Sequence, residues 1–253
     1  MVPDRRRCCA PRLVEGRRRV IPGIWLDVVD STLDELHSRA ADGAGDGMWV
    51  VAAEQRAGRG SRGRTWHSPR GGLWLSVLRR GAASPSGFEL LSLRAGLAIA
   101  RVLDGLPAVV PVMLKWPNDL VVRDRKVGGV LAEARWQGER LQWLAIGLGL
   151  NVANTVPVAL ADRAAALSDF CAETTVEALA EPLARALGEV DLETPALTPV
   201  ELAEFASRDW LLGQPVDTPI SGTGAGVSPN GRLLVRDALG HLHQVSAGEV
   251  ATR

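Results

Sequence analysis

The β-strand candidates in this sequence follow one another without regularly alternating helices, and this feature constrains the fold most. Residues 48–54 (MWVVAAE) and 73–79 (LWLSVLR) are apolar strand candidates that enclose a loop at 58–72. The loop has five glycines and no apolar periodicity, which is typical of an irregular connection. Residues 128–134 and 141–150 flank the polar turn WQGER and predict a hairpin. These connections exclude regular βαβ winding and predict an α+β core.

Other stretches carry helix and strand signals of their own. Asp30-Ser31-Thr32 is expected to open a helix that ends near Ala41, and Ser31 and Asp34 have the spacing of a capping box. Further helices are expected at 86–105, from Thr174 or Thr175 to about Val190, and from Pro199 to about Leu212. Strands are expected at IWLDVV, which starts at Ile24, and at VVPVMLKW, residues 109–116.

The stretch that starts at Gly213 differs from the preceding chain. Its β-prone runs are short, proline and glycine separate them, and Asn230-Gly231 is a hairpin signal. We therefore expect a main domain at residues 23–212 and a small β-barrel-like domain at 213–253. Residues 1–22 are basic and are expected to form a disordered leader.

The composition fits a globular protein of a reducing compartment. Hydrophobic residues make up 46% and charged residues 23% of the 253 residues, which is ordinary globular usage. Cys8, Cys9 and Cys171 have neither disulfide-framework nor zinc-site spacing and indicate a cytoplasmic protein. No apolar run approaches the roughly 20 residues of a membrane span, and no apolar segment typical of a signal peptide follows the basic N-terminus.

The net charge is 0, but the charge is uneven along the chain. Residues 1–20 contain seven arginines and two acidic residues, a net charge of +5 that leaves −5 for the rest. A nucleic-acid-binding protein that uses this tail and the loop at 58–64 is therefore an alternative. The net negative charge of the residues after position 20 disfavours this alternative, because attraction to nucleic acid would be weak beyond the tail.

The loop AGRGSRGRTWHSP, residues 57–69, has the chemistry of an anion-binding flap. Its glycines allow close backbone approach with several N–H groups turned toward an anion. Its arginines add forked donors that suit phosphate or carboxylate. GRGSRGRT also resembles a P-loop apart from Arg64, but Pro69, Gly71 and Gly72 exclude the helix that a P-loop requires.

The segment KWPNDL, residues 115–120, is a second candidate site. Lys115 and Lys126 are the only two lysines of the chain, since arginine supplies the other 27 basic residues. Lys115 lies in an apolar strand candidate and must reach an anion or a water-filled cleft, because burial of an unpaired ammonium is costly. Asn118 and Asp119 follow a strand-breaking proline. The alternatives are a solvated position at a sheet edge for Lys115, a turn-capping role for Asp119 and a solvated position at a hairpin edge for Lys126.

Taken together, GRGSRGRTW, KWPNDL, RKVGGVLAE and IGLGLNV resemble the motifs of biotin protein ligases, in the same order and with similar spacing. Ser31-Thr32 before a helix and Gln55 before the glycine-rich loop also match. The resemblance covers about residues 24–250. It implies a catalytic biotin- and ATP-binding domain of the class II synthetase and biotin/lipoate ligase type, with a mixed sheet flanked by helices. A C-terminal SH3-like barrel is implied at residues 213–253.

The resemblance also implies a two-step reaction. Biotin and MgATP give biotinyl-5′-AMP and pyrophosphate, and a lysine of a biotin carboxyl carrier domain of acetyl-CoA or acyl-CoA carboxylase then takes the biotinyl group. Implied catalytic residues are Lys115, Arg59 and Asp119. Implied biotin-binding residues are Ser31, Thr32, Leu33, Gln55, Arg59, Gly60, Ser61 and Lys115. Implied ATP- or adenylate-binding residues are Gly58, Arg62, Arg64, Trp66, Asn118, Lys126 and Asn151. We expect no protein side chain to bind a metal ion directly.

Two departures from the family pattern affect these expectations. Ser61 stands where relatives often have arginine, which predicts weaker retention of the adenylate unless Arg62 or Arg64 compensates. Leu33 stands where an asparagine commonly follows Ser-Thr, so one hydrogen-bonding partner of biotin is missing. Trp66 and Trp74 are candidates for the apolar wall of the site or for the core.

The segment before the first strand, about 23 residues, is too short for the DNA-binding domain of bifunctional relatives. We therefore expect a monofunctional ligase without DNA or membrane binding, as a monomer or weak homodimer. A lipoate or octanoate ligase is the alternative within the same fold.

Overall fold

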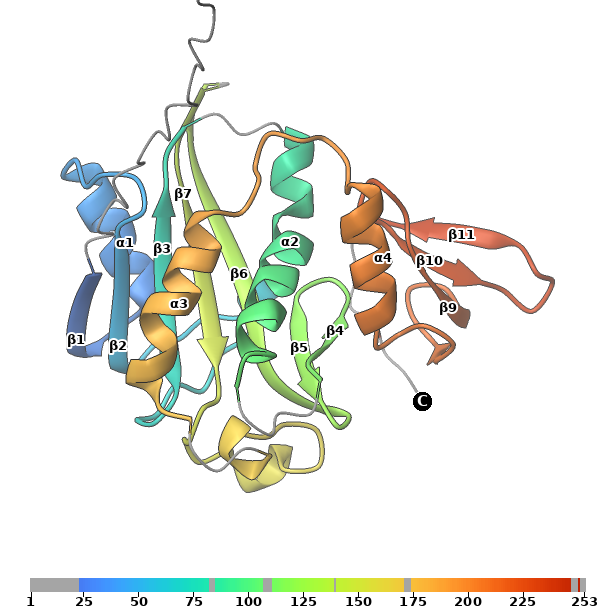
Figure 1. Ribbon diagram of the computed structural model, residues 1–253, viewed down its shortest axis with the longest axis horizontal. Coiled ribbons are helices and arrows are strands. Elements are labelled where there is room, and N and C mark those ends of the chain that lie inside the picture. Colours follow the sequence, from blue (N-terminus) through green and yellow to red (C-terminus); the bar gives the residue numbers. More distant parts are fainter. Residues whose placement is uncertain are drawn as a thin grey trace, which may run out of the picture.

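A seven-stranded mixed sheet forms the centre of the computed structural model, which describes residues 23–81, 85–106, 111–138, 140–170, 174–246 and 250. The strand order is β1-β2-β3-β7-β6-β5-β4 (Figure 1). β1 pairs with β2 in parallel and all other neighbours are antiparallel, so the predicted α+β core is confirmed. The strands are β1 Gly23–Val29, β2 Trp49–Gln55, β3 Leu73–Arg79, β4 Met113–Lys115, β5 Asp119–Val122, β6 Arg125–Gln137 and β7 Arg140–Leu150.

Helices pack on both faces of this sheet. α2 (Pro85–Leu103) and α3 (Val176–Gly188) lie side by side on one face, and α1 (Thr32–Ala41) packs on the other (Figure 1). Successive side chains of a strand point to opposite faces. Val51 accordingly joins the large cluster of α2 and α3, whereas Val50 joins Leu33 and Leu36 of α1. α1 is a short helix at one end of its face, and the cavity described below opens on that same face.

A separate four-stranded antiparallel sheet follows α4 (Pro199–Arg208), in the order β11-β10-β9-β8. Its strands are β8 Pro215–Val216, β9 Gly222–Val227, β10 Leu233–Arg236 and β11 Leu242–Val245. The arrangement is consistent with the SH3-like domain expected here. The predicted hairpin turn is present, since Gly231 lies between β9 and β10 with a φ of 74°. The Nε1–H of Trp116 donates to the Gly231 carbonyl at 2.8 Å and ties this sheet to the large one.

Several local predictions are confirmed and others are wrong. Thr175 caps α3, and the hairpin of β6 and β7 forms with a longer first strand than expected. The capping box at α1 does not form, because the Ser31 side chain makes no cap hydrogen bond and Asp34 pairs with Arg59 instead. The strand predicted at 109–116 is shortened to β4, although residues 107–110 lie outside the described residues, and β5 was not predicted.

The end of α4 and the two ends of the chain were also predicted. α4 ends at Arg208, four residues earlier than expected, and the chain then turns toward the second sheet. The leader at residues 1–22 and all three cysteines lie outside the described residues, and the domain boundary at residue 212 stays a prediction. In the part of the chain that the structure describes, no helix combines the length and apolarity needed to cross a bilayer.

Candidate active site

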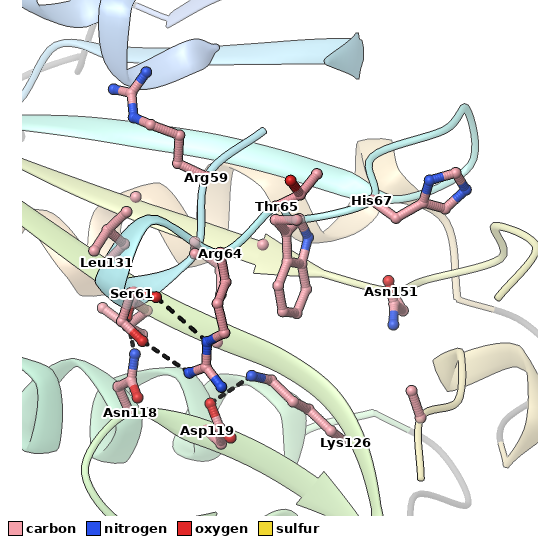
Figure 2. A pocket seen from close by; sticks show the side chains of 18 of the residues that line it. Arg59, Ser61, Arg64, Thr65, His67, Asn118, Asp119, Lys126, Leu131 and Asn151 are labelled. Carbon is pink, nitrogen blue, oxygen red and sulfur yellow. Dashed lines mark hydrogen bonds and ion pairs between the residues drawn. The ribbon is translucent and has the colours of Figure 1, made fainter. Parts of the chain in front are cut away.

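A cavity of about 890 Å³ lies on the α1 face of the large sheet. Its walls come from the N-terminus of α1, the glycine–arginine loop, strands β6 and β7, and the segment 154–164. Lys115 of β4 and Trp210 after α4 also line the cavity. Figure 2 shows the loop over the sheet with Arg64, Asp119 and Lys126 turned toward one another. Segments that are distant in sequence therefore converge on one hollow.

Glycines make the floor of the cavity. Gly129 of β6 pairs with Gly149 of β7, and Gly147 lies two residues earlier on the same face of the sheet. A Cβ atom on Gly149 would lie 2.6 Å from Nε1 of Trp66, and one on Gly147 would lie 3.2 Å from Leu33. The bare backbone thus lets the Trp66 indole approach the sheet closely and keeps the hollow open.

One end of the cavity is a network of hydroxyl and amide groups. The backbone N–H and the hydroxyl of Thr32 both donate to Oε1 of Gln55, at 2.9 and 3.1 Å. The Thr32 hydroxyl also lies 2.8 Å from that of Ser76, and Nε2 of Gln55 donates to the Ser68 hydroxyl at 2.9 Å. These bonds fix the orientation of the Gln55 amide. Buried groups held in this way suit a small polar ring that needs placed donors and acceptors.

Cations line the side of the cavity. Nζ of Lys126 lies 2.6 Å from a carboxylate oxygen of Asp119 and 5.0 Å from the centre of the Trp66 ring. Nζ of Lys115 lies 4.8 Å from the centre of the Trp210 ring. Both ammonium groups are within the distance at which an aromatic face attracts a cation. Together with Arg64, they give this side a positive character that suits carboxylate or phosphate.

Arg59 of the loop points to the side of the cavity. Its guanidinium makes a forked pair with Asp34 of α1, at 2.7 and 2.8 Å, and lies 3.3 Å from Glu133. The bond to Asp34 raises the pKa of Arg59. The hydrogen bond from His37 and the charge of Arg59 hold the pKa of Glu133 below its usual range. Figure 2 shows this guanidinium directed away from Arg64 and Lys126.

The tip of the loop is a tight turn stabilised by its own groups. Residues Ser61–Gly63 form one turn of 3-10 helix, in which Arg62 has a φ of 61° and is exposed. Arg64 donates to the hydroxyl and the carbonyl oxygen of Ser61, at 3.1 and 3.3 Å. Gly58 is buried at the base of the loop, where a Cβ atom would lie 2.5 Å from the Ser68 hydroxyl. Gly58 therefore permits close packing of the loop.

Comparisons with known proteins identify the family. A sequence model of the Biotin/lipoate A/B protein ligase family matches residues 25–151. The biotin–[acetyl-CoA-carboxylase] ligase of Mycobacterium tuberculosis is 34% identical over 239 residues, which are 89% of this chain and 88% of that protein. The chain belongs to the biotin/lipoate A/B protein ligase family. The chain spans about half, 47%, of the bifunctional ligase/repressor BirA of Bacillus subtilis, which is 35% identical over 154 residues and 59% of this chain.

Solved structures of the ligase family have the same fold. The biotin protein ligase of Aquifex aeolicus in complex with biotin and ATP matches with a TM-score of 0.75 and 28% identity, over 92% of this chain and 98% of that chain. The biotin protein ligase of Leishmania major in complex with biotinyl-5-AMP matches with a TM-score of 0.61 and 27% identity, over 89% and 99%. Both relatives therefore share the arrangement of sheet and helices described above.

The residues that the ligase motifs predict converge on the cavity with two exceptions. Gly58 and Arg62 do not line it. The predicted residues that do line it are Ser31, Thr32, Leu33, Gln55, Arg59, Gly60, Ser61, Arg64, Trp66, Lys115, Asn118, Asp119, Lys126 and Asn151. Trp74 is fully buried and belongs to the core, where its Nε1–H donates to the Pro69 carbonyl.

The two asparagines hold neighbouring segments in place. Nδ2 of Asn118 donates to the Val130 carbonyl at 2.6 Å, and Nδ2 of Asn151 donates to the Ala165 carbonyl at 3.1 Å. Asn154 in turn donates to Oδ1 of Asn151. Both side chains therefore tie the cavity wall to neighbouring segments through backbone carbonyls.

Other residues that line the cavity were not predicted. They include His67, Asp124, Leu131, Arg163 and Trp210. Trp210 lies 95 positions after Lys115 in the sequence, so only the fold brings the two together. Gly147 and Gly149 carried a usable signal, because glycines inside an apolar strand often mark close approach of another group.

Proposed function

We propose that this chain is an ATP-dependent biotin protein ligase. It activates biotin as biotinyl-5′-AMP and transfers the biotinyl group to one lysine of a biotin carboxyl carrier domain. One observation carries the proposal: a single cavity joins the fixed amide–hydroxyl network around Gln55 to a side that bears Lys115, Lys126 and Arg64. A ligand with a polar ring at one end and an acid that becomes joined to phosphate at the other fits this arrangement.

In this proposal the bicyclic end of biotin lies at the Thr32–Gln55 network. Thr32, Gln55 and the neighbouring Ser31 offer donors and acceptors to the ureido group. Leu33, packed against Gly147, contributes apolar surface beside it. The alkyl chain of biotin then runs over the glycine floor toward Lys115.

The first step forms a mixed anhydride. A carboxylate oxygen of biotin attacks the α-phosphorus of ATP, the bond to the bridging α–β oxygen breaks, and pyrophosphate leaves with that electron pair. The two anions repel each other, so a cation between them lowers the barrier by holding them in line. Lys115 is assigned this place. Arg59 and Arg64, with backbone N–H groups of the loop, cover the adenylate and exclude water that would hydrolyse it.

The second step forms an amide. The ε-amine of the carrier lysine attacks the acyl carbon of the anhydride, the carbon–oxygen bond to AMP breaks, and AMP leaves. The amine loses a proton in this step, and the Asp119 carboxylate is the group assigned to take it. Its ion pair with Lys126 holds the Asp119 side chain at the cavity wall.

Magnesium enters this reaction with ATP. Among the described residues, no group of three or more potential ligand side chains could hold a metal ion. The proposed ion is held by phosphate oxygens and water, with no direct bond to a protein side chain. The ion would neutralise phosphate charge when it is bound.

The proposed partner is a carrier domain of acetyl-CoA or acyl-CoA carboxylase. The name of the Mycobacterium tuberculosis relative contains acetyl-CoA carboxylase, which supports this assignment. We place the reaction in the cytoplasm. A monomer or weak homodimer without DNA or membrane binding stays our expectation for the assembly.

The direct test is incubation of the chain with biotin, ATP, magnesium and a carrier domain, followed by an avidin blot. Labelling is expected only when ATP is present, and Lys115→Ala is expected to reduce it at least tenfold. Absence of labelling on a carrier that another biotin ligase does label would contradict the proposal.

The family name also includes lipoate ligases, so the acid substrate needs its own test. Biotin, lipoate and octanoate are compared for exchange of labelled pyrophosphate into ATP. Biotin alone is expected to support exchange, and support by lipoate or octanoate in place of biotin would favour the alternative.

A further inference from the structure

Lys115 and Trp210 meet across the edge of the large sheet. β4, the edge strand, ends at Lys115, and Trp210 lies two residues after the last residue of α4. Nζ of Lys115 lies 4.8 Å from the centre of the indole ring. Both residues line the cavity, so the contact lies in the site itself.

Trp210 is itself held from two sides. Its backbone N–H donates to the Leu114 carbonyl at 3.0 Å, which places the residue beside the end of β4. Its Nε1–H donates to a carboxylate oxygen of Asp124 at 2.9 Å. The first bond fixes the backbone and the second fixes the ring, so the indole face has a defined direction.

The two lysines are held by different kinds of group. Lys126 lies 2.6 Å from the Asp119 carboxylate. Nζ of Lys115 lies over the face of the Trp210 indole, and an aromatic face attracts a cation through its quadrupole. The indole therefore gives the Lys115 ammonium a preferred direction.

We propose that Trp210 is a positioning residue that orients the Lys115 ammonium for the adenylation step, with Asp124 fixing the indole. This inference rests on the proposed function, in which Lys115 contacts the carboxylate and the α-phosphate. Trp210 acts through Lys115 and does not touch the reacting atoms. It also makes the connection between α4 and the second sheet part of the active site.

The test measures biotin-dependent exchange of pyrophosphate into ATP, which reports the first step alone. Trp210→Leu is expected to lower kcat of exchange by about 2- to 30-fold, the range of a cation–π contact, with a smaller change in KM for biotin. Trp210→Phe keeps an aromatic face and is expected to retain more activity than Trp210→Leu. In a Lys115→Ala background, Trp210→Leu is expected to cause no further fall.

Asp124 provides a second route that leaves the indole in place. Its φ is 66°, so Asp124→Gly removes the acceptor without backbone strain. A fall of about 2- to 10-fold is expected, the range of one hydrogen bond, whereas Asp124→Asn keeps an acceptor and is expected to stay near wild type. Trp25→Leu is the matched control, since Trp25 is half exposed on β1 and does not line the cavity.

The outcomes separate the inference from the function on which it rests. The positioning role would be overturned if the wild type exchanges pyrophosphate and Trp210→Leu lowers kcat by the same factor in the wild-type and the Lys115→Ala backgrounds. The ligase function would then stay intact. Unchanged exchange in both Trp210→Leu and Asp124→Gly would do the same. A wild-type protein without biotin-dependent exchange would overturn the proposed function and, with it, the role of Trp210.

Discussion

At the scale of single residues, the two lysines of this arginine-rich chain have different surroundings. Lys126 pairs with Asp119 and lies over Trp66, whereas Lys115 lies over Trp210. A compact ammonium suits a small junction between carboxylate and phosphate better than the planar guanidinium of arginine does. We therefore keep Lys115 as the residue proposed for the reacting junction and Lys126 as the residue proposed to support Asp119 and Trp66.

Ser61 allows a direct test of adenylate retention. Its hydroxyl accepts a bond from Arg64 at 3.1 Å, so it orients a cation without supplying one. Ser61→Arg adds a guanidinium to the loop and is expected to slow release of biotinyl-5′-AMP about tenfold, the effect of one charge-assisted hydrogen bond. Release is measured by rapid filtration of labelled adenylate, with Ser61→Ala as the control that adds no charge. Equal release from wild type and Ser61→Arg would contradict the idea.

The buried carboxyl group of Asp209 is expected to make the free energy of unfolding depend on pH. Burial raises its pKa to about 6, well above the usual range of an aspartate, and in the described structure its Oδ2 has no hydrogen-bond partner. Below about pH 4 the carboxyl is protonated in both folded and unfolded chains. As pH rises to about 6 the unfolded chain ionises first, so the folded state loses about 1–3 kcal/mol of stability, and this loss persists above pH 6.

The measurement compares urea unfolding of wild type and Asp209→Asn between pH 4 and 8. The variant keeps an oxygen that accepts from the Leu211 N–H but does not titrate. Its stability relative to wild type is expected to increase across pH 4–6 and then stay level. A difference that does not change with pH would show that Asp209 ionises normally in the folded protein.

At the scale of elements, prediction from sequence succeeded where a local pattern decides the structure. β3 was predicted with its observed limits, and the glycine–arginine loop was placed correctly between β2 and β3. β5 was missed because its four residues follow Pro117 and are stabilised by pairing with β4 and β6. Such pairing is a tertiary effect with no local signal.

The candidate site was likewise predictable where local sequence motifs define it and unpredictable where it depends on tertiary packing. Motifs located the loop and Lys115 because their residue types carry the chemistry. The Trp210 contact and the Arg59 pair with Asp34 depend on how distant elements pack. The role of Asp34 was predicted wrongly for the same reason. Its spacing from Ser31 predicted a helix cap, but its side chain pairs with Arg59 of the loop.

The pairing of α1 with the loop predicts a measurable competition. Arg59 must leave Asp34 if it is to cover the adenylate. Asp34→Asn weakens the pair and is expected to tighten binding of biotinyl-5′-AMP by about 2- to 5-fold, the value of an exposed ion pair. Isothermal titration calorimetry with a non-hydrolysable adenylate analogue measures this affinity. Glu35→Gln is the matched control, because Glu35 lies on the same helix and pairs with Arg39; equal tightening in both variants would rule out a specific competition.

At the scale of the whole molecule, the second sheet is joined to the large one beside the lysine site. The Leu114 carbonyl accepts from Trp210, and the Trp116 indole donates to Gly231. Lys115 thus lies between two residues that contact the C-terminal part of the chain. Displacement of the second sheet is therefore expected to disturb the adenylation site as well as the stability of the fold.

Gly231→Ala tests this junction. A Cβ atom there would lie 2.6 Å from Leu90 and 3.1 Å from Leu93 of α2, at a φ of 74°. Gly240→Ala is the control, because Gly240 has a φ of 88° and open space around it, so it carries backbone strain without the clash. Gly231→Ala is expected to be less stable than Gly240→Ala by about 1–3 kcal/mol in urea unfolding, the usual cost of overpacking.

Pyrophosphate exchange on the same two variants then separates stability from function. Under conditions where both are folded, Gly231→Ala is expected to lose exchange activity, because the clash moves the carbonyl that holds Trp116 next to Lys115. Gly240→Ala lies in the turn between β10 and β11 and is expected to keep it. If both variants exchange pyrophosphate at the wild-type rate, the second sheet supports the fold without controlling the position of Lys115.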